Sequence, residues 1–388
     1  MVDWKSLGDI CEIKGRIGFR GYTRDDQVDK GEGAISLSPG NINDGVVNYN
    51  SCTYITWNKY EESPEIMVSE GDIILCKTAS VGKVARIHSL PEKATINPQL
   101  VLIKNIKTDP QFLLYVLSDS PFQSKLKGLA GVGSVPNVSQ AKLSSIQIPI
   151  PSLSEQLRIV GILDTFTSSI ENLKEQIAQR RKQYEYYRDQ LLNLEGKEGV
   201  EMKHISDVAK SFTGLTYKPE NVSEEGTLVL RSSNINEDVL AFDDNVFVQM
   251  VIPDRAIVKE NDILICVRNG SKRLVGKAAI ITKKAEGMAF GAFMTILRSF
   301  GIDSKFLFYV WQSKKVKKQY KGDEAMPIAQ ITAKDFQRII IPVPPLSEQQ
   351  RIVSILDTFE ASIRNLEQQL AQREKQYEYY RNKLLTFE

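Results

Sequence analysis

Residues 149–192 read PIPSLSEQLRIVGILDTFTSSIENLKEQIAQRRKQYEYYRDQLL, and residues 342–385 read PVPPLSEQQRIVSILDTFEASIRNLEQQLAQREKQYEYYRNKLL. The second stretch repeats the first after a shift of 193 positions, and 31 of the 44 aligned residues are identical. Self-similarity of this strength at one fixed shift indicates that the chain contains one structural unit twice. We therefore predict a molecule with a pseudo-twofold internal repeat.

The segments that precede the two near-copies resemble each other more loosely, so each copy consists of a variable region followed by a nearly fixed one. This divides the chain into residues 1–148, 149–195, 203–341 and 342–388. The matches between the variable regions are NIN at 41–43 and 234–236, GDIIL at 71–75 and NDILI at 261–265, VGKVA at 81–85 and VGKAA at 275–279, and PQFLLYV at 110–116 and SKFLFYV at 304–310.

The two nearly fixed stretches predict long helices. Prolines bar helix upstream of each stretch, and Ser154 and Ser347 follow them as expected N-caps. Apolar and aromatic residues then recur in alternating steps of four and three, which is the spacing of a coiled-coil seam. Arg180 and Arg373 take the one seam position that is not apolar. The predicted coiled-coil residues are Leu163, Phe166, Ile170, Leu173, Ile177 and Tyr184 in the first helix and Leu356, Phe359, Ile363, Leu366, Leu370 and Tyr377 in the second.

Two arrangements can bury these seams. A single amphipathic helix most often lies on its own domain, whereas two matched seams of the same period can pack against each other or against like helices of a partner chain. At ~1.5 Å per residue, a helix of about 40 residues is roughly 60 Å long, which is more than one small domain needs. We therefore favour a helix pair formed within the chain, and its antiparallel sense is a hypothesis.

Each variable region combines short strands with helices. The chain of 388 residues, 42% of them hydrophobic, can form several cores. The expected fold class is α+β, with two α+β domains separated by an antiparallel two-helix coiled coil. The predicted strands are 72–76, 83–88, 99–104, 262–267, 277–282 and 293–298, and the predicted helices are 110–119 and 304–320.

The net charge excludes a global attraction to nucleic acid, because 50 Lys and Arg oppose 48 Asp and Glu. The balance differs by region: residues 1–148 hold 16 basic and 16 acidic groups, and residues 203–341 hold 21 basic and 16 acidic groups. Any DNA binding must therefore depend on local clusters of basic residues.

Basic residues gather with glycines in three such loops, which suits contacts to phosphates and base edges. The loops at 77–83 and 268–277 differ on an otherwise shared scaffold, which implies different targets. For the first loop, at 14–24, a solvated segment without a ligand is an equal alternative. The predicted DNA-binding residues are Arg16, Arg20 and Arg24 in the first loop, Lys77 and Lys83 in the second, and Arg268, Asn269, Lys272, Arg273 and Lys277 in the third.

A fourth basic cluster falls at helical spacing. Lys314, Lys317, Lys318 and Lys321 fall at helical spacing on one face, at and directly after the end of the predicted helix 304–320. A solvent-exposed face is the commoner explanation for such a stripe, and anchoring of DNA phosphates is the alternative.

The motifs that several enzyme classes require are missing. The sequence has no GxxxxGKS/T nucleotide loop, no Asn or Asp followed by two prolines and an aromatic residue as in amino-group methyltransferases, and no serine or cysteine elbow to accompany His88 and His204. The four cysteines lack a zinc-binding spacing and suit a reducing compartment. No stretch approaches ~18 uninterrupted apolar residues, and the N-terminal segment does not resemble a signal peptide. We expect no catalytic residue, metal site or membrane span, and a cytoplasmic location.

The doubled motif PxPxLSEQxRIVxILDTF, continuing into NLxxQxAQRxKQYEYYRxxLL, follows in each copy a region with GDI or NDI, VGK, and FL and YV one residue apart. In this arrangement nearly the whole chain resembles the specificity subunits of type I restriction-modification systems. The resemblance implies that residues 1–148 and 203–341 are target recognition domains, each reading one half of a bipartite site in double-stranded DNA. It also implies that the helical repeats at 149–195 and 342–388 form an antiparallel coiled coil that sets the spacing of the half-sites.

The resemblance further implies partners. Two methyltransferase subunits are expected to dock on the coiled coil, and restriction (translocase) subunits to join the complex. S-adenosylmethionine and ATP with Mg²⁺ are expected on those partners, with no cofactor on this chain and no membrane. An alternative from another class is a coiled-coil scaffold that binds protein or RNA partners. A self-sufficient nuclease or methyltransferase is least favoured because of the missing motifs.

Overall fold

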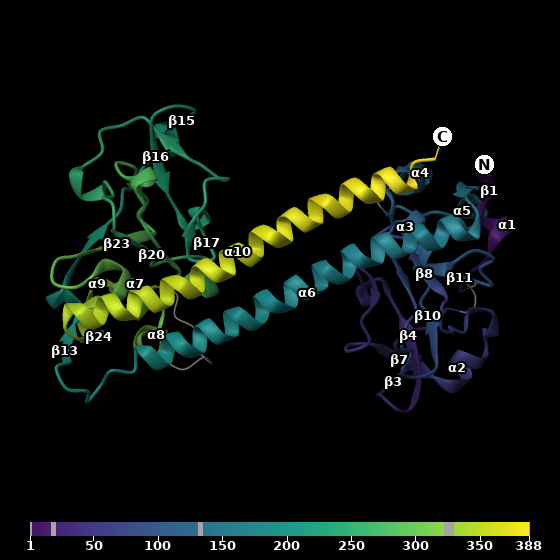
Figure 1. The fold of residues 1–388 in the computed structure, drawn as a ribbon, viewed down its shortest axis with the longest axis horizontal. Coiled ribbons are helices and arrows are strands. Elements are labelled where there is room, and N and C mark those ends of the chain that lie inside the picture. The colour runs from purple at the N-terminus through teal and green to yellow at the C-terminus, as the bar shows by residue number, and fades with distance from the viewer. Residues whose placement is uncertain (1, 17–20, 131–134, 322–329, 388) are drawn as a thin grey trace. The chain divides into compact units, whose positions relative to one another are not determined.

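The computed structural model describes residues 2–16, 21–130, 135–321 and 330–387. The chain forms two compact units: unit 1 is Met1–Lys174 with Gln369–Glu388, and unit 2 is Glu175–Gln368. Each unit combines one variable region with a part of each of two long helices, α6 (Leu153–Leu191, 39 residues) and α10 (Leu346–Leu385, 40 residues) (Figure 1).

Unit 1 contains two sheets and a strand pair. Six strands form one sheet in the order β2-β11-β8-β9-β6-β5, four form another in the order β10-β4-β7-β3, and β1 pairs antiparallel with β12. The strands are β1 (Asp3–Ser6), β2 (Glu12–Lys14), β3 (Gln27–Val28), β4 (Gly33–Leu37), β5 (Ile42–Asn43), β6 (Gly45–Val47), β7 (Thr53–Thr56), β8 (Ile73–Cys76), β9 (Val84–Arg86), β10 (Ala94–Ile96), β11 (Leu100–Lys104) and β12 (Gln147–Ile150). Its helices besides the two long ones are α1 (Leu7–Ile10), α2 (Trp57–Glu61), α3 (Pro110–Ser118), α4 (Ser120–Leu129) and α5 (Gln140–Ser144).

Unit 2 repeats this plan with one difference: the strands that correspond to β5 and β6, β17 and β18, form a separate two-stranded sheet instead of extending the larger one. The strand order β14-β23-β20-β21 corresponds to β2-β11-β8-β9 of unit 1, and the order β15-β19-β16-β22 corresponds to β3-β7-β4-β10. As β1 does with β12, β13 pairs antiparallel with β24. The strands are β13 (Glu201–His204), β14 (Ala209–Thr213), β15 (Val222–Ser223), β16 (Thr227–Leu230), β17 (Ile235–Asn236), β18 (Val239–Leu240), β19 (Phe247–Val248), β20 (Ile263–Cys266), β21 (Ala278–Ile280), β22 (Ala289–Phe290), β23 (Met294–Ser299) and β24 (Ile340–Val343). The helices are α7 (Ser304–Gln312), α8 (Lys314–Lys321) and α9 (Ala333–Arg338).

The central strand of each unit separates two hydrophobic cores. In β8, Ile73 and Leu75 pack in the core that contains α3, whereas Ile74 and Cys76 pack in the core between the two sheets. In β20, alternate residues divide between two cores in the same way. Successive side chains of a strand point to opposite faces, so a strand buried on both faces needs an uninterrupted apolar run. This accounts for GDIIL and NDILI in the sequence.

The predicted strands of the variable regions coincide with β8, β9, β11, β20, β21 and β23. The predicted helix 110–119 corresponds to α3, but the single helix predicted at 304–320 is wrong. The chain leaves the helical conformation at Ser313, whose ψ is 148°, and α8 then begins at Lys314. The Ser313 hydroxyl accepts a hydrogen bond of 3.3 Å from the backbone amide of Val316 and thereby caps α8.

The helix starts also differ from the expectation. α6 begins at Leu153, and the Ser152 hydroxyl, not that of Ser154, accepts the hydrogen bond from the amide of Glu155 at 3.4 Å. Ser347 lies within the first turn of α10, which begins directly after Pro345. A capping side chain must precede the helix, so the prolines together with Ser152 set these starts.

The two long helices pack antiparallel in both units. In unit 1 the rings of Phe166 and Tyr380 stack at 5.3 Å, and Lys174 pairs with Glu374. In unit 2 the rings of Tyr187 and Phe359 stack at 5.4 Å, and Arg181 pairs with Glu367. In each unit the partner's number falls on α10 as the number rises on α6, which confirms the antiparallel hypothesis.

The seam residues serve two purposes. Leu163 is fully buried in the core of unit 1 and Leu356 in that of unit 2, so the first turns of each long helix belong to a domain core. Further along, the remaining seam residues are buried or half-buried, and Arg373 lies over the Phe166 ring at 5.7 Å. The helices therefore lie on a domain and also on each other, which combines the two arrangements weighed from the sequence. The seam residues with this half-buried or buried character are Phe166, Ile170, Leu173, Ile177, Tyr184, Phe359, Ile363, Leu366, Leu370 and Tyr377.

Candidate nucleic-acid interface

Equivalent loops follow the central strand of each unit. Residues 77–83 connect β8 to β9, and residues 267–277 connect β20 to β21. Both loops end on the glycine and lysine of the VGK motif. The backbone of Gly82 has a φ of +100° and that of Gly276 a φ of +90°, a conformation that favours glycine.

Helical side chains hold both glycines. The Gln123 side chain on α4 donates a hydrogen bond of 3.0 Å to the carbonyl of Gly82, and the Trp311 indole on α7 donates one of 2.9 Å to the carbonyl of Gly276. Trp311 is fully buried and its ring stacks on that of Tyr320 at 4.8 Å. The base of each loop is thus anchored to the domain, and the residues between strand and anchor form its tip. This anchoring role of the glycines was not predicted from the sequence, although the recurrence of VGK in both variable regions could have indicated it.

The unit 2 loop carries a basic, exposed tip. Arg268, Lys272 and Arg273 are exposed, and residues Lys272–Leu274 form a short 3-10 helix. The Arg268 guanidinium lies over the Phe293 ring at 5.4 Å, and Phe293 is itself 57% exposed. A cation beside an exposed aromatic ring can contact phosphates and bases together. Lys277, next to the anchored glycine, is half-buried.

Asn269 is used within the loop. Its side-chain amide donates a hydrogen bond of 2.9 Å to the Ser232 hydroxyl, and its oxygen accepts one of 2.9 Å from the amide of Ser271. Because these bonds engage both ends of the amide, we interpret Asn269 as a residue that shapes the loop, not as one that reads a base edge.

The unit 1 loop is shorter and less basic. Lys83 is exposed, and its ammonium group lies 3.4 Å from the carbonyl of Pro39. Lys77 is half-buried, and the backbone beside it pairs with a neighbouring segment, where the Thr78 hydroxyl donates a hydrogen bond of 2.8 Å to Asn137.

A turn built around one buried asparagine adjoins each loop. The Asn41 side-chain oxygen accepts a hydrogen bond of 2.9 Å from the amide of Ser38, and that of Asn234 accepts one of 2.9 Å from the amide of Arg231. The same two asparagines donate to carbonyls farther along the chain, at Asn48 and Ala241 respectively. The NIN motif is therefore structural in both units, and its asparagines hold the turns next to the loops.

The first basic segment differs from the prediction. Arg16 is only 4% exposed, and its guanidinium donates hydrogen bonds of 3.2 Å to the carbonyl of Ile96 and to the Thr95 hydroxyl. A guanidinium buried and bonded in this way is not placed to contact a phosphate, so we do not propose Arg16 as a DNA contact. Arg20 lies outside the described residues. Arg24 is exposed on a short 3-10 helix, Arg24–Asp26, and stays a prediction.

The lysine stripe is partly engaged by α6 and the segment after it. Lys314 pairs with Asp189, with its Nζ 3.6 Å from the carboxylate, and the neighbouring Lys315 pairs with Glu195. Lys318 is exposed. We therefore favour a structural role for the start of this stripe over anchoring of DNA phosphates.

The side chains that join the long helices to the domains were not predicted from the sequence, although a helix lying on its own domain was one of the two arrangements considered. The Gln156 side chain on α6 accepts a hydrogen bond of 2.9 Å from the amide of Asp109, and the Gln349 side chain on α10 accepts one of 2.8 Å from that of Asp303. Both aspartates are the N-caps of the domain helices, α3 and α7. The glutamine of each LSEQ motif thus joins the start of a long helix to the start of a domain helix.

Within the described residues, no group of three or more His, Cys, Asp or Glu side chains is placed to hold a metal ion. Among the helices formed by these residues, none has the length and apolar character needed to cross a membrane. All four cysteines are free thiols.

Comparisons with known proteins agree with this architecture. A family model described as the type I restriction modification DNA specificity domain matches residues 1–180 and again residues 197–375. The specificity subunit of the type I restriction enzyme EcoR124I/EcoR124II from Escherichia coli is 32% identical over 273 residues, and the match spans 65% of this chain and 65% of that relative. A putative type I restriction enzyme MjaX specificity subunit from Methanocaldococcus jannaschii is 27% identical and is covered over 93% of its length by 99% of this chain.

Solved structures show the same fold. A chain from a structure of a type I R-M system, described for its complex assembly and conformational transition, superposes with a TM-score of 0.63 at 18% identity, over 99% of this chain and 97% of that one. The crystal structure of the type I restriction-modification S subunit from M. genitalium superposes with a TM-score of 0.56 at 17% identity, over 100% and 97% of the two chains.

Proposed function

The chain belongs to the type I restriction-modification DNA specificity family, and from this premise we propose that each of its variable regions reads one half of a bipartite DNA site. Proteins of this family supply sequence specificity, and the enzymatic activity lies in partner subunits. The recognition domains that we propose are residues 1–148 and 203–341, and the helical repeats are residues 149–195 and 342–388.

One observation carries this proposal: the two units share a framework but differ in the loop that follows the central strand. The strand order, the anchored glycine and the buried asparagine are repeated, whereas residues 77–83 and 267–277 differ in length and charge. A constant framework with different loops suits two modules that recognise different sequences.

The contacts that we propose lie mainly on exposed parts of these loops. In the second domain they are Arg268, Lys272 and Arg273, with Phe293 beside Arg268 and Lys277 at the loop base. In the first domain they are Lys77, Lys83 and Arg24. The more basic second domain is expected to supply the larger electrostatic share of DNA affinity.

We further propose that the pair of long helices acts as a spacer. Two modules joined by a stiff connector bind one duplex cooperatively only if the connector matches the distance between their sites, about one helical turn or ~34 Å for adjacent grooves on one face of DNA. The paired α6 and α10 supply such a connector. Inserting one heptad into both helices should then change the preferred gap between the half-sites.

The enzymatic activity is expected to lie in partner subunits. We propose that two methyltransferase subunits dock on the helical repeats, that restriction subunits join them, and that S-adenosylmethionine and ATP with Mg²⁺ are bound by those partners. We propose no cofactor and no catalytic residue for this chain. It would work in the cytoplasm, where DNA and these subunits meet.

Exchange of one domain tests the proposal. Residues 203–341 are replaced by the corresponding domain of another family member, and methylated adenines are mapped in DNA exposed to the complete complex. We expect one half of the recognised site to change and the other to persist. A change in both halves would contradict modular reading, and no methylation directed by either chain would favour a scaffold that binds protein or RNA.

A further inference from the structure

The two long helices are nearly the same in sequence, so each could in principle pair with its own kind. The helical repeats share 31 of 44 aligned residues, including most of the apolar seam. An α6 seam that fits α10 would therefore also fit the α6 of a second copy of the chain. Some difference between the helices must favour the pairing that occurs within one chain.

Two of the differing positions lie where α6 meets α10. Lys174 and Arg181 on α6 correspond in the repeat to Glu367 and Glu374 on α10, so both positions are basic in one helix and acidic in the other. In unit 1 the Lys174 ammonium lies 3.8 Å from the Glu374 carboxylate. In unit 2 the Arg181 guanidinium lies 2.6 Å from the Glu367 carboxylate.

Self-pairing in the same antiparallel register would reverse both interactions. Lys174 of one copy would then face Arg181 of the other, and this like-charge contact would occur twice in a pair of α6 helices. In a pair of α10 helices, Glu367 would face Glu374, again twice. Charges that flank an apolar seam determine partner choice in coiled coils by this combination of attraction and repulsion.

We propose that Lys174, Arg181, Glu367 and Glu374 are the specificity determinants that make α6 select the α10 of its own chain and reject a second copy. Each contact is partly exposed, with side-chain exposures of 50% for Lys174 and Glu374, 42% for Arg181 and 34% for Glu367. Exposed ion pairs add little stability singly. Their role is selection, because exchange of partners replaces both of these attractions by repulsions.

The contacts at the ends of the two long helices also favour pairing within one chain. In unit 1, Arg381 near the end of α10 lies 3.5 Å from Asp119 of the domain, and the next residue, Asn382, is neutral. In unit 2, the equivalent arginine of α6, Arg188, instead donates to its own neighbour Asp189 at 3.3 Å.

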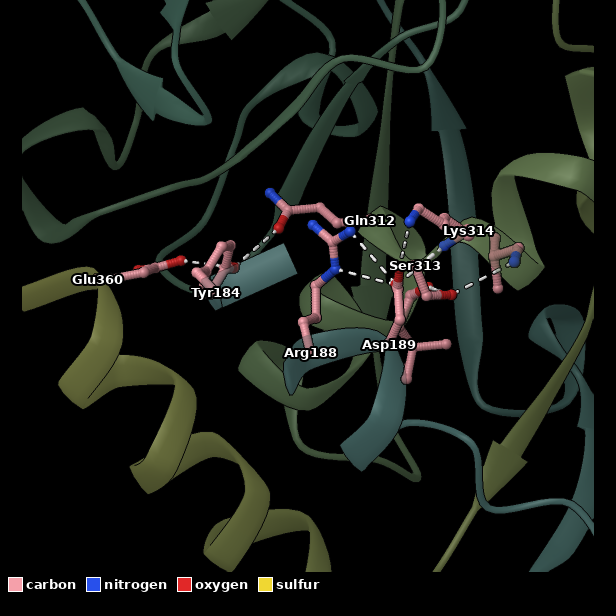
Figure 2. A network of polar contacts seen from close by, with 9 residues as sticks. Tyr184, Arg188, Asp189, Gln312, Ser313, Lys314 and Glu360 are labelled. Atoms are coloured by element: carbon pink, nitrogen blue, oxygen red, sulfur yellow. Dashed lines mark hydrogen bonds and ion pairs between the residues drawn. The ribbon is translucent and has the colours of Figure 1, made fainter. Parts of the chain in front are cut away.

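Asp189 in turn accepts a hydrogen bond of 3.2 Å from the amide of Lys314 (Figure 2). An α6 end placed on a second copy's first domain would bring Asp189 beside Asp119 and away from Lys314. Two carboxylates would then share one arginine, which disfavours that placement.

Charge exchange within the chain provides the test. In the variant Lys174→Glu/Glu367→Lys, both contacts between α6 and α10 of one chain become like-charged, whereas self-pairs of either helix become oppositely charged. The net charge of +2 is unchanged. Arg181→Glu/Glu374→Lys produces the same reversal, but it also removes the contact of Arg181 with Glu237 of the β17–β18 turn, so the first variant is the cleaner one. The quadruple exchange restores opposite charges between the two helices and serves as the matched control. Because it contains Arg181→Glu, it also carries Glu237→Gln, which removes the carboxylate that the new acidic group at position 181 would otherwise face.

The readout is the mass of the full-length chain by light scattering across a concentration series, without DNA or partners. We expect the unchanged chain and the quadruple variant to remain at the monomer mass of 43.7 kDa under conditions where the double variants dimerise at least tenfold more tightly. High salt should reduce the difference, since it screens exposed charges.

Opposite outcomes overturn the proposal. Folded double variants that associate no more than the unchanged chain would show that the charges do not select the partner, and so would a quadruple variant that dimerises like the doubles. Circular dichroism checks the fold. If both double variants are unfolded and the quadruple variant is folded, charge sign governs pairing within the chain, as proposed. A quadruple variant as unfolded as the doubles would refute it.

Discussion

Tyr309 on α7 donates a hydrogen bond of 2.6 Å to Asp357 on α10. The equivalent residues of unit 1, Tyr115 and Asp164, form the same bond at 2.5 Å. The tyrosine of the YV motif and the aspartate of the ILDTF motif therefore recognise each other in both units. Together with the glutamine of LSEQ, this bond joins each domain to the start of one long helix.

Loss of this bond should destabilise each unit, and unit 1 more. After removal of the tyrosine hydroxyl, Asp357 keeps its ion pair with the Lys305 ammonium group at 2.7 Å, whereas Asp164 keeps a hydrogen bond of 3.4 Å from the neutral Gln111 amide. Hydrogen bonds to charged groups contribute about 1.5–3 kcal/mol. We expect Tyr115→Phe to lower the unfolding free energy by about that amount and Tyr309→Phe by less, as measured by urea denaturation. Equal losses would contradict the compensating role of Lys305.

The loop of unit 2 should contribute to DNA affinity through phosphates. Replacing Lys272 and Arg273 by Ala should reduce the slope of log K against log[salt] by about 0.9 for each phosphate that the variant no longer neutralises, and should leave sequence preference unchanged. The measurement is a salt titration of binding by the assembled complex, with Lys259→Ala, an exposed residue outside the loop, as the control. An unchanged slope would remove these residues from the interface.

Phe293 should behave differently from its basic neighbours. Its exposed ring beside Arg268 is placed to contact bases, and stacking on a base contributes about 1–3 kcal/mol. We expect Phe293→Leu to weaken binding and to alter the preference at one half-site without changing the salt slope. Binding to libraries randomised in each half-site measures this. Altered preference in both half-sites would argue against a local role.

Replacement of Arg16 should affect the stability of the fold, whereas replacement of Arg24 should affect DNA binding. Because the Arg16 guanidinium is buried and bonded to Ile96 and Thr95, Arg16→Ala leaves buried acceptors unpaired and should cost about 1–3 kcal/mol of stability. Arg24→Ala, at an exposed site, should leave stability nearly unchanged and lower the salt slope of DNA binding. Thermal unfolding and salt titration of DNA binding measure both properties for both variants. An Arg16→Ala variant of unchanged stability, or an Arg24→Ala variant with an unchanged salt slope, would contradict these roles.

Glu360 should make the stability of unit 2 depend on pH. Burial raises the pKa of this carboxyl above its ordinary value of 4.5, against the hydrogen bond from Tyr184 at 3.2 Å and the nearby Arg364, which lower it. Since the folded-state pKa is the higher one, the protonated form stabilises the fold. This contribution is complete below the unfolded value and is lost as pH rises through the folded value.

The neutral variant Glu360→Gln should therefore be more stable than the unchanged chain at pH 7, with the difference vanishing near pH 4. Urea denaturation across this range measures the difference. Glu360→Thr, which introduces the residue found at the equivalent position 167, is the matched variant and should show the same trend. A constant difference at all pH values would contradict the buried carboxyl as its source.

Local periodicity explains why much of the architecture could be predicted. The heptad spacing of the seam and the apolar runs of β8 and β20 reflect which side of a helix or strand is buried, and this is encoded within a few residues. The repeat itself indicated two like domains. The predictions that failed are the single helix at 304–320 and the N-caps at Ser154 and Ser347. These features, like the burial of Arg16, depend on side-chain contacts that are not visible from spacing.

The sequence alone thus determined that one unit occurs twice, with two matched helical seams and two α+β regions, because these features repeat along the chain. Only the tertiary structure decided that Arg16 is buried, since its acceptors lie some 80 positions away at Thr95 and Ile96. It also decided that Gln156 meets Asp109 and that Lys174 meets Glu374. Such contacts depend on which distant segments folding brings together, and no local pattern records that.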